Sequence, residues 1–241
     1  MLIIKANAEK DIGLINAYTL RELRPDEVFC FSAILCNNLP DRDNERFTDA
    51  ALRKMAELFP GKPGLIGHEW GGDTSSARVY RAAVEDLDGG GLGLRGDVYI
   101  PRIPALAELI DKIETGVVKE VSVGVRVAKR TCSICGAQMY WDECKEGHIK
   151  GQEYDGAVCL GLLDDPTDAF EFSFVSVPAQ PGAGIIKSLA DVSPTMALDR
   201  LMQPDVVLMA DSPEVRKLLG KIDGGARRAE ILRDNEKFLK G

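Results

Sequence analysis

Histidine, aromatic residues and long apolar runs are scarce in this chain of 241 residues, which has two His and 6% aromatic residues. No uninterrupted apolar run approaches the roughly 18 residues that a membrane-spanning helix needs. The apolar stretch at the N-terminus is too short for a signal peptide. We therefore expect a soluble globular protein in a reducing cytosol, with no membrane partner. In that setting the six Cys are metal ligands or buried thiols rather than disulfides.

Basic residues are also in short supply, because 30 Lys and Arg face 38 Asp and Glu, for a net charge of −8. Nucleic acid is bound through clustered Lys and Arg, so this balance argues against a direct nucleic-acid partner. No phosphate-binding loop with a Lys-Ser or Lys-Thr end is present, and Gly89-Gly-Gly-Leu-Gly lacks the strand-to-helix pattern of a nucleotide site. Kinases and nucleotide-dependent oxidoreductases are thereby disfavoured.

Two regions of different texture follow each other along the chain. Residues 1–188 are rich in Gly, Val and Phe. Residues 189–241 read either as short helices, one of them capped by Ser212, or as a flexible solvated extension. Pro and Gly punctuate the join, which we place near residues 187–192. The sequence therefore predicts one sizeable domain followed by a short C-terminal tail.

Strand signals outnumber helix signals in the larger region. The predicted helices are residues 47–59, capped by Thr48 or Asp49, and residues 104–116, which begin at Pro104 and end at Gly116. The predicted strands are residues 28–35, 77–84, 93–100, 117–129 and 169–177, the second and third joined as a hairpin. This mixture predicts an α+β fold or a β-barrel with helices outside it.

Ser122 lies in the most regular of these strands. Valines at positions 121, 123, 125 and 127 alternate with other residues, so a strand directs the valines one way and Ser122 the other. Ser122 is then either a surface serine on an amphipathic strand or a nucleophile held on a rigid strand. In the second case Gly124 would leave space for a substrate backbone. Periodicity alone does not choose between these readings.

His68 is the one His outside the cysteine-rich segment, and Gly residues lie on both sides of it. A His in such a loop is commonly just exposed, but this imidazole is also the one available as general base for a serine nucleophile. A carboxylate would then have to orient the ring. Glu171 is the first candidate, because alternation puts it opposite a face of Phe residues at 170, 172 and 174. Weaker candidates are Asp168, Glu69 and Glu120.

The segment of about residues 130–160 holds the most specific local signal, a cluster of Cys and His. Two residues separate Cys132 from Cys135, and three separate Cys144 from His148. These spacings suit a tetrahedral zinc site, and a site closed by four protein ligands is normally structural. Two alternatives stay open, in which Cys159 replaces one ligand or the thiols are simply reduced.

The surroundings of this cluster are acidic, which disfavours a zinc ribbon that binds nucleic acid. The acidic residues are Asp142, Glu143, Glu146, Glu153 and Asp155. The two remaining cysteines, Cys30 and Cys36, lie among apolar residues and are read as buried small side chains.

Several segments, taken in order, resemble the prohead proteases of tailed bacteriophages, serine peptidases whose fold is similar to that of herpesvirus assemblins. The resemblance runs from about Val28 to Ala183. It rests on Cys36-Asn-Asn-Leu-Pro-Asp-Arg-Asp-Asn-Glu-Arg-Phe-Thr, Phe59-Pro-Gly-Lys-Pro-Gly-Leu-Ile-Gly-His68, Ala77-Arg-Val-Tyr, Gly116-Val-Val-Lys-Glu-Val-Ser122-Val-Gly-Val and Glu171-Phe-Ser-Phe-Val-Ser-Val-Pro-Ala-Gln-Pro-Gly-Ala. The order of these segments matters more than any one motif.

The resemblance implies an assemblin-like β-barrel with outer helices, in which Ser122 is the nucleophile, His68 its general base and Glu171 the third member. It places Cys132, Cys135, Cys144 and His148 in a small zinc-knuckle insert, with no cofactor needed for catalysis. The implied substrates are the major capsid protein, the scaffold protein and the protease itself, inside the assembling prohead in the bacterial host cytoplasm. Assemblins further imply a homodimer, and residues 189–241 then form a scaffold-like tail.

Two rival functions come from other classes of protein. One is a catalytically inactive relative that only scaffolds capsid assembly, and the other is a regulatory module whose zinc knuckle and tail bind a partner. The presence of both Ser122 and His68 at their family positions favours the enzyme.

Overall fold

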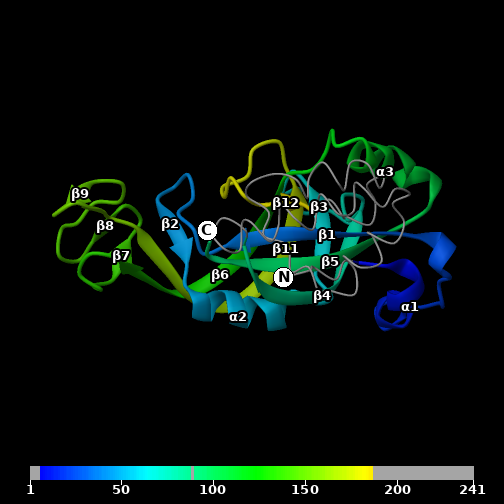
Figure 1. The fold of residues 1–241 in the computed structure, drawn as a ribbon, viewed down its shortest axis with the longest axis horizontal. Helices are drawn as coiled ribbons and strands as arrows, with labels where there is room; N and C mark the ends of the chain where they lie inside the picture. The colour runs from blue at the N-terminus through cyan, green and yellow to red at the C-terminus, as the bar shows by residue number, and fades with distance from the viewer. Residues whose placement is uncertain (1–5, 88–89, 187–241) are drawn as a thin grey trace, which may run out of the picture. The chain divides into compact units, whose positions relative to one another are not determined.

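An eight-stranded mixed sheet dominates the structure, a computed structural model that describes residues 6–87 and 90–186 (Figure 1). Its strands lie in the order β12 (Gly184–Ile185), β1 (Val28–Asn37), β5 (Leu92–Pro101), β4 (Ala77–Asp86), β3 (Pro63–Ile66), β11 (Gly161–Phe174) and β2 (Glu45–Phe47), and β6 (Val121–Cys132) pairs with β11. The predicted domain boundary and the tail, including Ser212, lie outside the described residues.

Three α-helices and two short 3₁₀ segments accompany this sheet in the described residues. They are α1 (Ala8–Asn16), α2 (Asp49–Leu58), α3 (Ala107–Glu114), η1 (Pro25–Glu27) and η2 (Pro104–Leu106). The α+β class is therefore confirmed. None of these helices is long and apolar enough to cross a bilayer.

Both predicted helices are confirmed, whereas α1 carried no prediction. Helix α2 begins after Thr48, whose Oγ1 accepts the backbone N–H of Ala51 at 3.0 Å. Helix α3 follows the turn of Pro104 and is succeeded by Gly116 at φ 77°, the left-handed conformation that favours glycine. Both helices bury apolar residues in the main core.

The predicted barrel is not closed in the described part of the chain. The two-residue strand β12 pairs with β1 but reaches the start of β6 only through an isolated bridge between Gly184 and Glu120. A continuous ladder would require a longer β12, because a bridge of one residue pair cannot carry the pairing around. The observed architecture is therefore an open mixed sheet with few helices.

Most strand predictions hold, and the hairpin of β4 and β5 pairs antiparallel as expected. The last strand, however, begins at Gly161 rather than at residue 169 and ends at Phe174 rather than at residue 177. The acidic run of residues 164–168 resembles a turn in the sequence. In the structure β11 continues pairing with β6 through that run, with register shifts between Pro166 and Asp168 and between Ala169 and Glu171.

The valine alternation of β6 behaves as the sequence predicts. Val121 is fully buried in the main core, and the valines at 123, 125 and 127 pack against it. The residues between them therefore project from the opposite face of the sheet. Ser122 and Gly124 belong to that second face.

Candidate active site and metal centre

Three neighbouring strands bring the predicted catalytic residues together. Ser122 on β6 pairs directly with Ser173 on β11, and Gly124 pairs with Glu171. On the other side of β11, Ser173 pairs with Leu65 of the parallel strand β3, three residues before His68. Direct partners in a ladder share one face of the sheet, so β11 carries Glu171 between a serine strand and a histidine loop.

His68 and Glu171 are in direct contact, with Nδ1 of His68 2.9 Å from Oε1 of Glu171. An ionised carboxylate can only accept, so this contact favours the ring tautomer that carries its proton on Nδ1; in the neutral ring Nε2 is then the acceptor. The Glu171 side chain is 2% exposed, whereas that of His68 is 42% exposed. The buried carboxylate therefore orients a ring that solvent and a substrate can reach.

The backbone around His68 adopts an uncommon conformation. Gly67 and His68 have φ values of 63° and 61°. Glycine takes a left-handed φ without strain, but a side-chain-bearing residue such as His68 does so at a cost and needs surrounding contacts to hold it. The chain therefore turns at Gly67 and His68.

Ser173 was not singled out from the sequence, yet it connects the site. Its Oγ donates a hydrogen bond to Oε2 of Glu171 at 2.6 Å and accepts the backbone N–H of His68 at 3.1 Å. Ser173 is fully buried and so is not available as a nucleophile. The one signal in the sequence was its position two residues after Glu171, which places both side chains on one face of a strand.

Gly124 has a different role from the one expected. A Cβ built on it would overlap Oε1 of Glu171. The space beside Gly124 is therefore occupied by the carboxylate and is not left empty for a substrate backbone. A side chain at position 124 would therefore displace the carboxylate of Glu171, which lies directly across the ladder.

Ser122 is half-buried on the same face as this cluster. No hydrogen bond joins its hydroxyl to His68 or to another group among the residues that the structure describes. Catalytic hydrogen bonds are often long or poorly aligned in enzymes without substrate, so a missing hydrogen bond does not exclude His68 as the base for Ser122.

The weaker carboxylate candidates do not contact His68 in the described part of the chain. Asp168 binds Nζ of Lys62 at 3.2 Å, Glu120 lies 3.5 Å from Nζ of Lys119, and Glu69 is exposed. Glu171 is therefore the carboxylate that the fold brings to the imidazole.

The expected face of three Phe residues is wrong at one position. Phe172 and Phe174 are buried in the main core, but Phe170 packs against Trp70 with ring centroids 5.4 Å apart. The register shift between Ala169 and Glu171 explains this, because an extra residue in one strand reverses the alternation before it.

At the other end of β6 and β11, the four predicted metal ligands converge. The ligand atoms of Cys132, Cys135, Cys144 and His148 lie within 4.8 Å of one another. Two of the measured separations are 3.7 Å between the sulfurs of Cys135 and Cys144 and 3.3 Å from Nδ1 of His148 to Sγ of Cys135. Two sulfurs on a tetrahedral zinc ion lie about 3.8 Å apart, so the donor set and its spacing fit a metal such as zinc.

Cys159 lies beside this cluster but outside the group of four. Its Sγ is 3.6 Å from that of Cys132. Burial and the hydrogen bond with Cys132 raise the pKa of the Cys159 thiol to about 12. Burial also opposes ionisation of Cys132, but backbone N–H groups of Cys135 and Ile134 bring the pKa of Cys132 below its ordinary value. Cys159 thus suits a protonated thiol that donates to a thiolate ligand.

The insert that carries the cluster has little secondary structure and a very small core of its own. Its strands are two residues long: β7 (Met139–Tyr140), β8 (Glu143–Cys144), β9 (Glu153–Tyr154) and β10 (Ala157–Val158). Figure 1 shows them beyond the far ends of β6 and β11. The buried residues of the insert are three Cys and one Met, and a core this small needs a metal or another cross-link to be stable.

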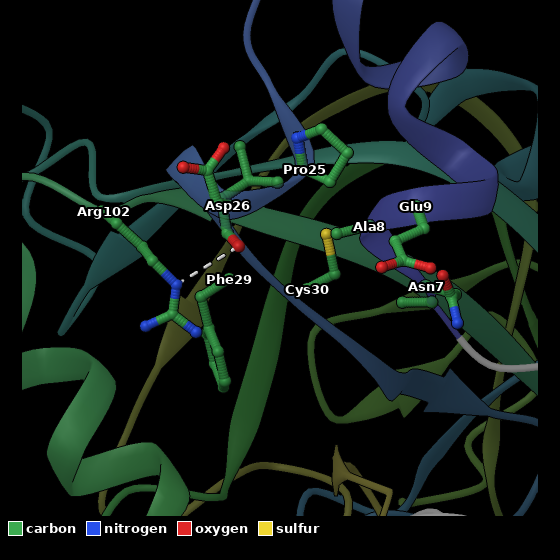
Figure 2. Close-up of a pocket in the computed structure, with 10 residues that line it drawn as sticks. Asn7, Ala8, Glu9, Pro25, Asp26, Phe29, Cys30 and Arg102 are labelled. Atoms are coloured by element: carbon green, nitrogen blue, oxygen red, sulfur yellow. Dashed lines mark hydrogen bonds between the residues drawn. The ribbon is translucent and has the colours of Figure 1, made fainter.

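A separate pocket lies near the first helix (Figure 2), and none of the predicted catalytic or metal-binding residues lines it. Arg102 lies over the ring of Phe29 at 5.5 Å, and its Nε donates to the carbonyl of Val28 at 3.3 Å. Cys30 is half-buried in this pocket, whereas Cys36 is buried in the main core as expected.

Comparison with protein-family models gave no match, and comparison with curated proteins gave no relative.

Proposed function

We propose that this chain is a serine endopeptidase of the prohead-protease type. One observation carries the proposal: the buried carboxylate of Glu171 lies 2.9 Å from Nδ1 of His68, on the sheet face that also bears Ser122. A serine, an imidazole and an orienting carboxylate are the groups that acyl transfer to a serine requires. The motif order from Val28 to Ala183 supports the family assignment and its assemblin-like fold.

In this mechanism Nε2 of His68 takes the proton of the Ser122 hydroxyl, and Oγ bonds to the carbonyl carbon of a peptide. The C–N bond then breaks as His68 returns the proton to the leaving amine. Water, deprotonated by His68, hydrolyses the resulting ester and releases Ser122. Glu171 keeps the imidazole in the required tautomer throughout, and Ser173 holds Glu171 in place.

The proposed substrates are the major capsid protein, the scaffold protein and the protease itself, cut inside an assembling prohead in the bacterial host cytoplasm. Dense packing of substrate in a shell raises its effective concentration, so a modest intrinsic activity suffices. The proposal includes a homodimer and a scaffold-like role for residues 189–241. Zinc on the Cys/His cluster has a structural role and takes no part in hydrolysis.

Intact-mass spectrometry tests this proposal. The wild type and the Ser122→Ala variant are incubated alone and with the capsid or scaffold protein whose gene neighbours that of this chain. Fragments from the wild type and not from the variant are the expected result, and their masses locate the cut. Unchanged masses for a folded wild type with capsid substrate present contradict the proposal.

The competing candidate is a catalytically inactive assembly protein, and the missing hydrogen bond between Ser122 and His68 in the described residues is the observation that favours it. Capsid assembly that tolerates Ser122→Ala, without any proteolysis by the wild type, would identify that function.

A further inference from the structure

Arg126 lies on the same face of β6 as Ser122, four residues further along the strand. At roughly 3.3 Å per residue this is a separation of about 13 Å along the strand. The guanidinium carbon of Arg126 lies 5.2 Å from the ring centroid of Phe170, a distance at which a cation is attracted to an aromatic face. The ring therefore holds the charged group above the sheet, near the proposed catalytic cluster.

Trp70 completes this group of side chains, which we call the aromatic–arginine site (Trp70, Phe170 and Arg126). Its side chain contacts Phe170 while being 71% exposed, and it follows His68 by two residues. Thr74 stabilises the loop, since its Oγ1 accepts the backbone N–H of Gly71 at 3.1 Å and donates to the carbonyl oxygen of Gly71 at 2.8 Å. A large exposed aromatic residue beside a candidate active site is available for contact with a substrate.

The guanidinium of Arg126 has no ion-pair or side-chain hydrogen-bond partner among the described residues. The carboxylate nearest in the ladder is that of Asp168, the residue opposite Arg126 on β11, and Lys62 already binds it at 3.2 Å. All the donors of Arg126 are thus open to a ligand. A planar guanidinium recognises carboxylates in particular, because two of its N–H groups match the two carboxylate oxygens.

We propose that the aromatic–arginine site is a specificity subsite for an acidic side chain of the peptide substrate, about four residues from the bond that Ser122 cleaves. Arg126 binds the carboxylate, and Trp70 and Phe170 contact the apolar part of the neighbouring substrate residues. This inference rests on the proposed peptidase function and adds the chemical class of the sequence that it cuts.

The test uses a positional-scanning library of decapeptides in which one position at a time is Glu, Gln or Lys. For wild type we expect a preference for Glu over Gln of roughly tenfold in kcat/KM at one position, three to five residues from the cut. Arg126→Gln removes the preference and Arg126→Glu transfers it to Lys. Lys129→Gln removes the same charge from the same strand and is the matched control, which leaves the preference unchanged.

A binding measurement separates this inference from the peptidase proposal. The Ser122→Ala, Trp141→Phe protein cannot acylate and retains Trp70 as its one tryptophan, so its fluorescence reports binding at the subsite. We expect the dissociation constant obtained from this fluorescence to be about tenfold lower for Glu peptides than for Gln peptides. Arg126→Gln should abolish the difference.

The outcomes are distinct. Ser122-dependent cleavage with no Glu preference, or a preference that survives Arg126→Gln, overturns the subsite and leaves the peptidase. Arg126-dependent binding of Glu peptides without any cleavage overturns the peptidase and leaves an acidic-peptide binding site. Binding of none of the peptides overturns the subsite.

Discussion

The two ends of the antiparallel strand pair β6–β11 hold two sites that depend on different forces. The end with Ser122 and Glu171 lies within the main sheet, where the loop after β3 adds His68 from a distant part of the sequence. At the other end Cys132 is the last residue of β6 and still pairs with Gly161 of β11. The cysteine cluster there comes from one local stretch that ends at Cys159. The first site is held by tertiary packing, whereas the second is a local Cys/His cluster whose donor atoms could hold a metal.

This difference has a practical consequence for substitutions. A change in the sheet cluster should impair catalysis through small shifts of side chains, because its groups must align within tenths of an ångström. A change in the cysteine cluster should release the metal and unfold the insert locally, with little effect at the other end. Ten residue steps of β6, about 33 Å, separate Ser122 from Cys132.

The largest effect is expected for His68→Ala. Removing the general base should lower kcat/KM for a peptide substrate by at least about 10⁴-fold, as loss of a triad member does. Circular dichroism and the melting temperature should stay close to those of wild type, because the His68 side chain is 42% exposed. Undiminished cleavage by a purified variant would remove His68 from the mechanism.

Gly124→Ala comes next. The added Cβ would overlap Oε1 of Glu171, so the carboxylate must turn away from His68. We expect a fall of about 10²-fold in kcat/KM and a loss of about 1–3 kcal/mol in unfolding free energy, measured by urea titration. Gly72→Ala is the control, since a Cβ there meets nothing within 4 Å. Equal activity of the two variants would show that Glu171 does not need this space.

Ser173→Ala should have a smaller effect of about tenfold in kcat/KM. Ser173 does not touch the reacting atoms and acts through Glu171 and the His68 backbone. A positioning role predicts that the Nδ1 proton of His68, observed by NMR, shifts or exchanges faster in the variant. If the resonance and the activity are both unchanged, Ser173 has no positioning role and contributes only to packing.

Cys135→Ser tests the opposite end of the β6–β11 strand pair. We expect the variant to lose the bound metal, which native mass spectrometry measures. Its activity on a short peptide should stay within about threefold of that of the wild type. Loss of activity in parallel with the metal would show that the two ends are coupled.

Cys159→Ser is its matched variant. Cys159 is a neighbour of Cys132 and not a ligand. Its replacement should therefore lower the metal affinity by about 10-fold or more without abolishing binding. Complete loss of the metal would make Cys159 a ligand instead.

Local signals in the sequence predicted several parts of the structure well. The Thr48 cap, the Gly116 terminus, the valine alternation of β6 and the ligand spacing from Cys132 to His148 all involve residues close in the chain, whose geometry follows from helix and strand periods. The early start of β11 was missed, because an acidic run that continues a strand looks the same as one that forms a turn.

The errors at the candidate active site share one cause. The bulge between Ala169 and Glu171 moves Phe170 out of the core, and only pairing with β6 reveals it. The space beside Gly124 was misread because the residue across the ladder is unknown until strands are aligned. Ser173 was passed over for the same reason.

The sequence by itself determined the α+β class, the cluster of Cys and His and a short list of reactive side chains, because these follow from composition and local spacing. The tertiary structure decided that Glu171, and not Asp168, Glu69 or Glu120, contacts His68. It also decided that Arg126 is held on Phe170 without a polar partner in the described residues. These two contacts join residues about 100 and about 44 positions apart in the chain. They depend on the register of the strands, which is fixed by the burial of a whole sheet face.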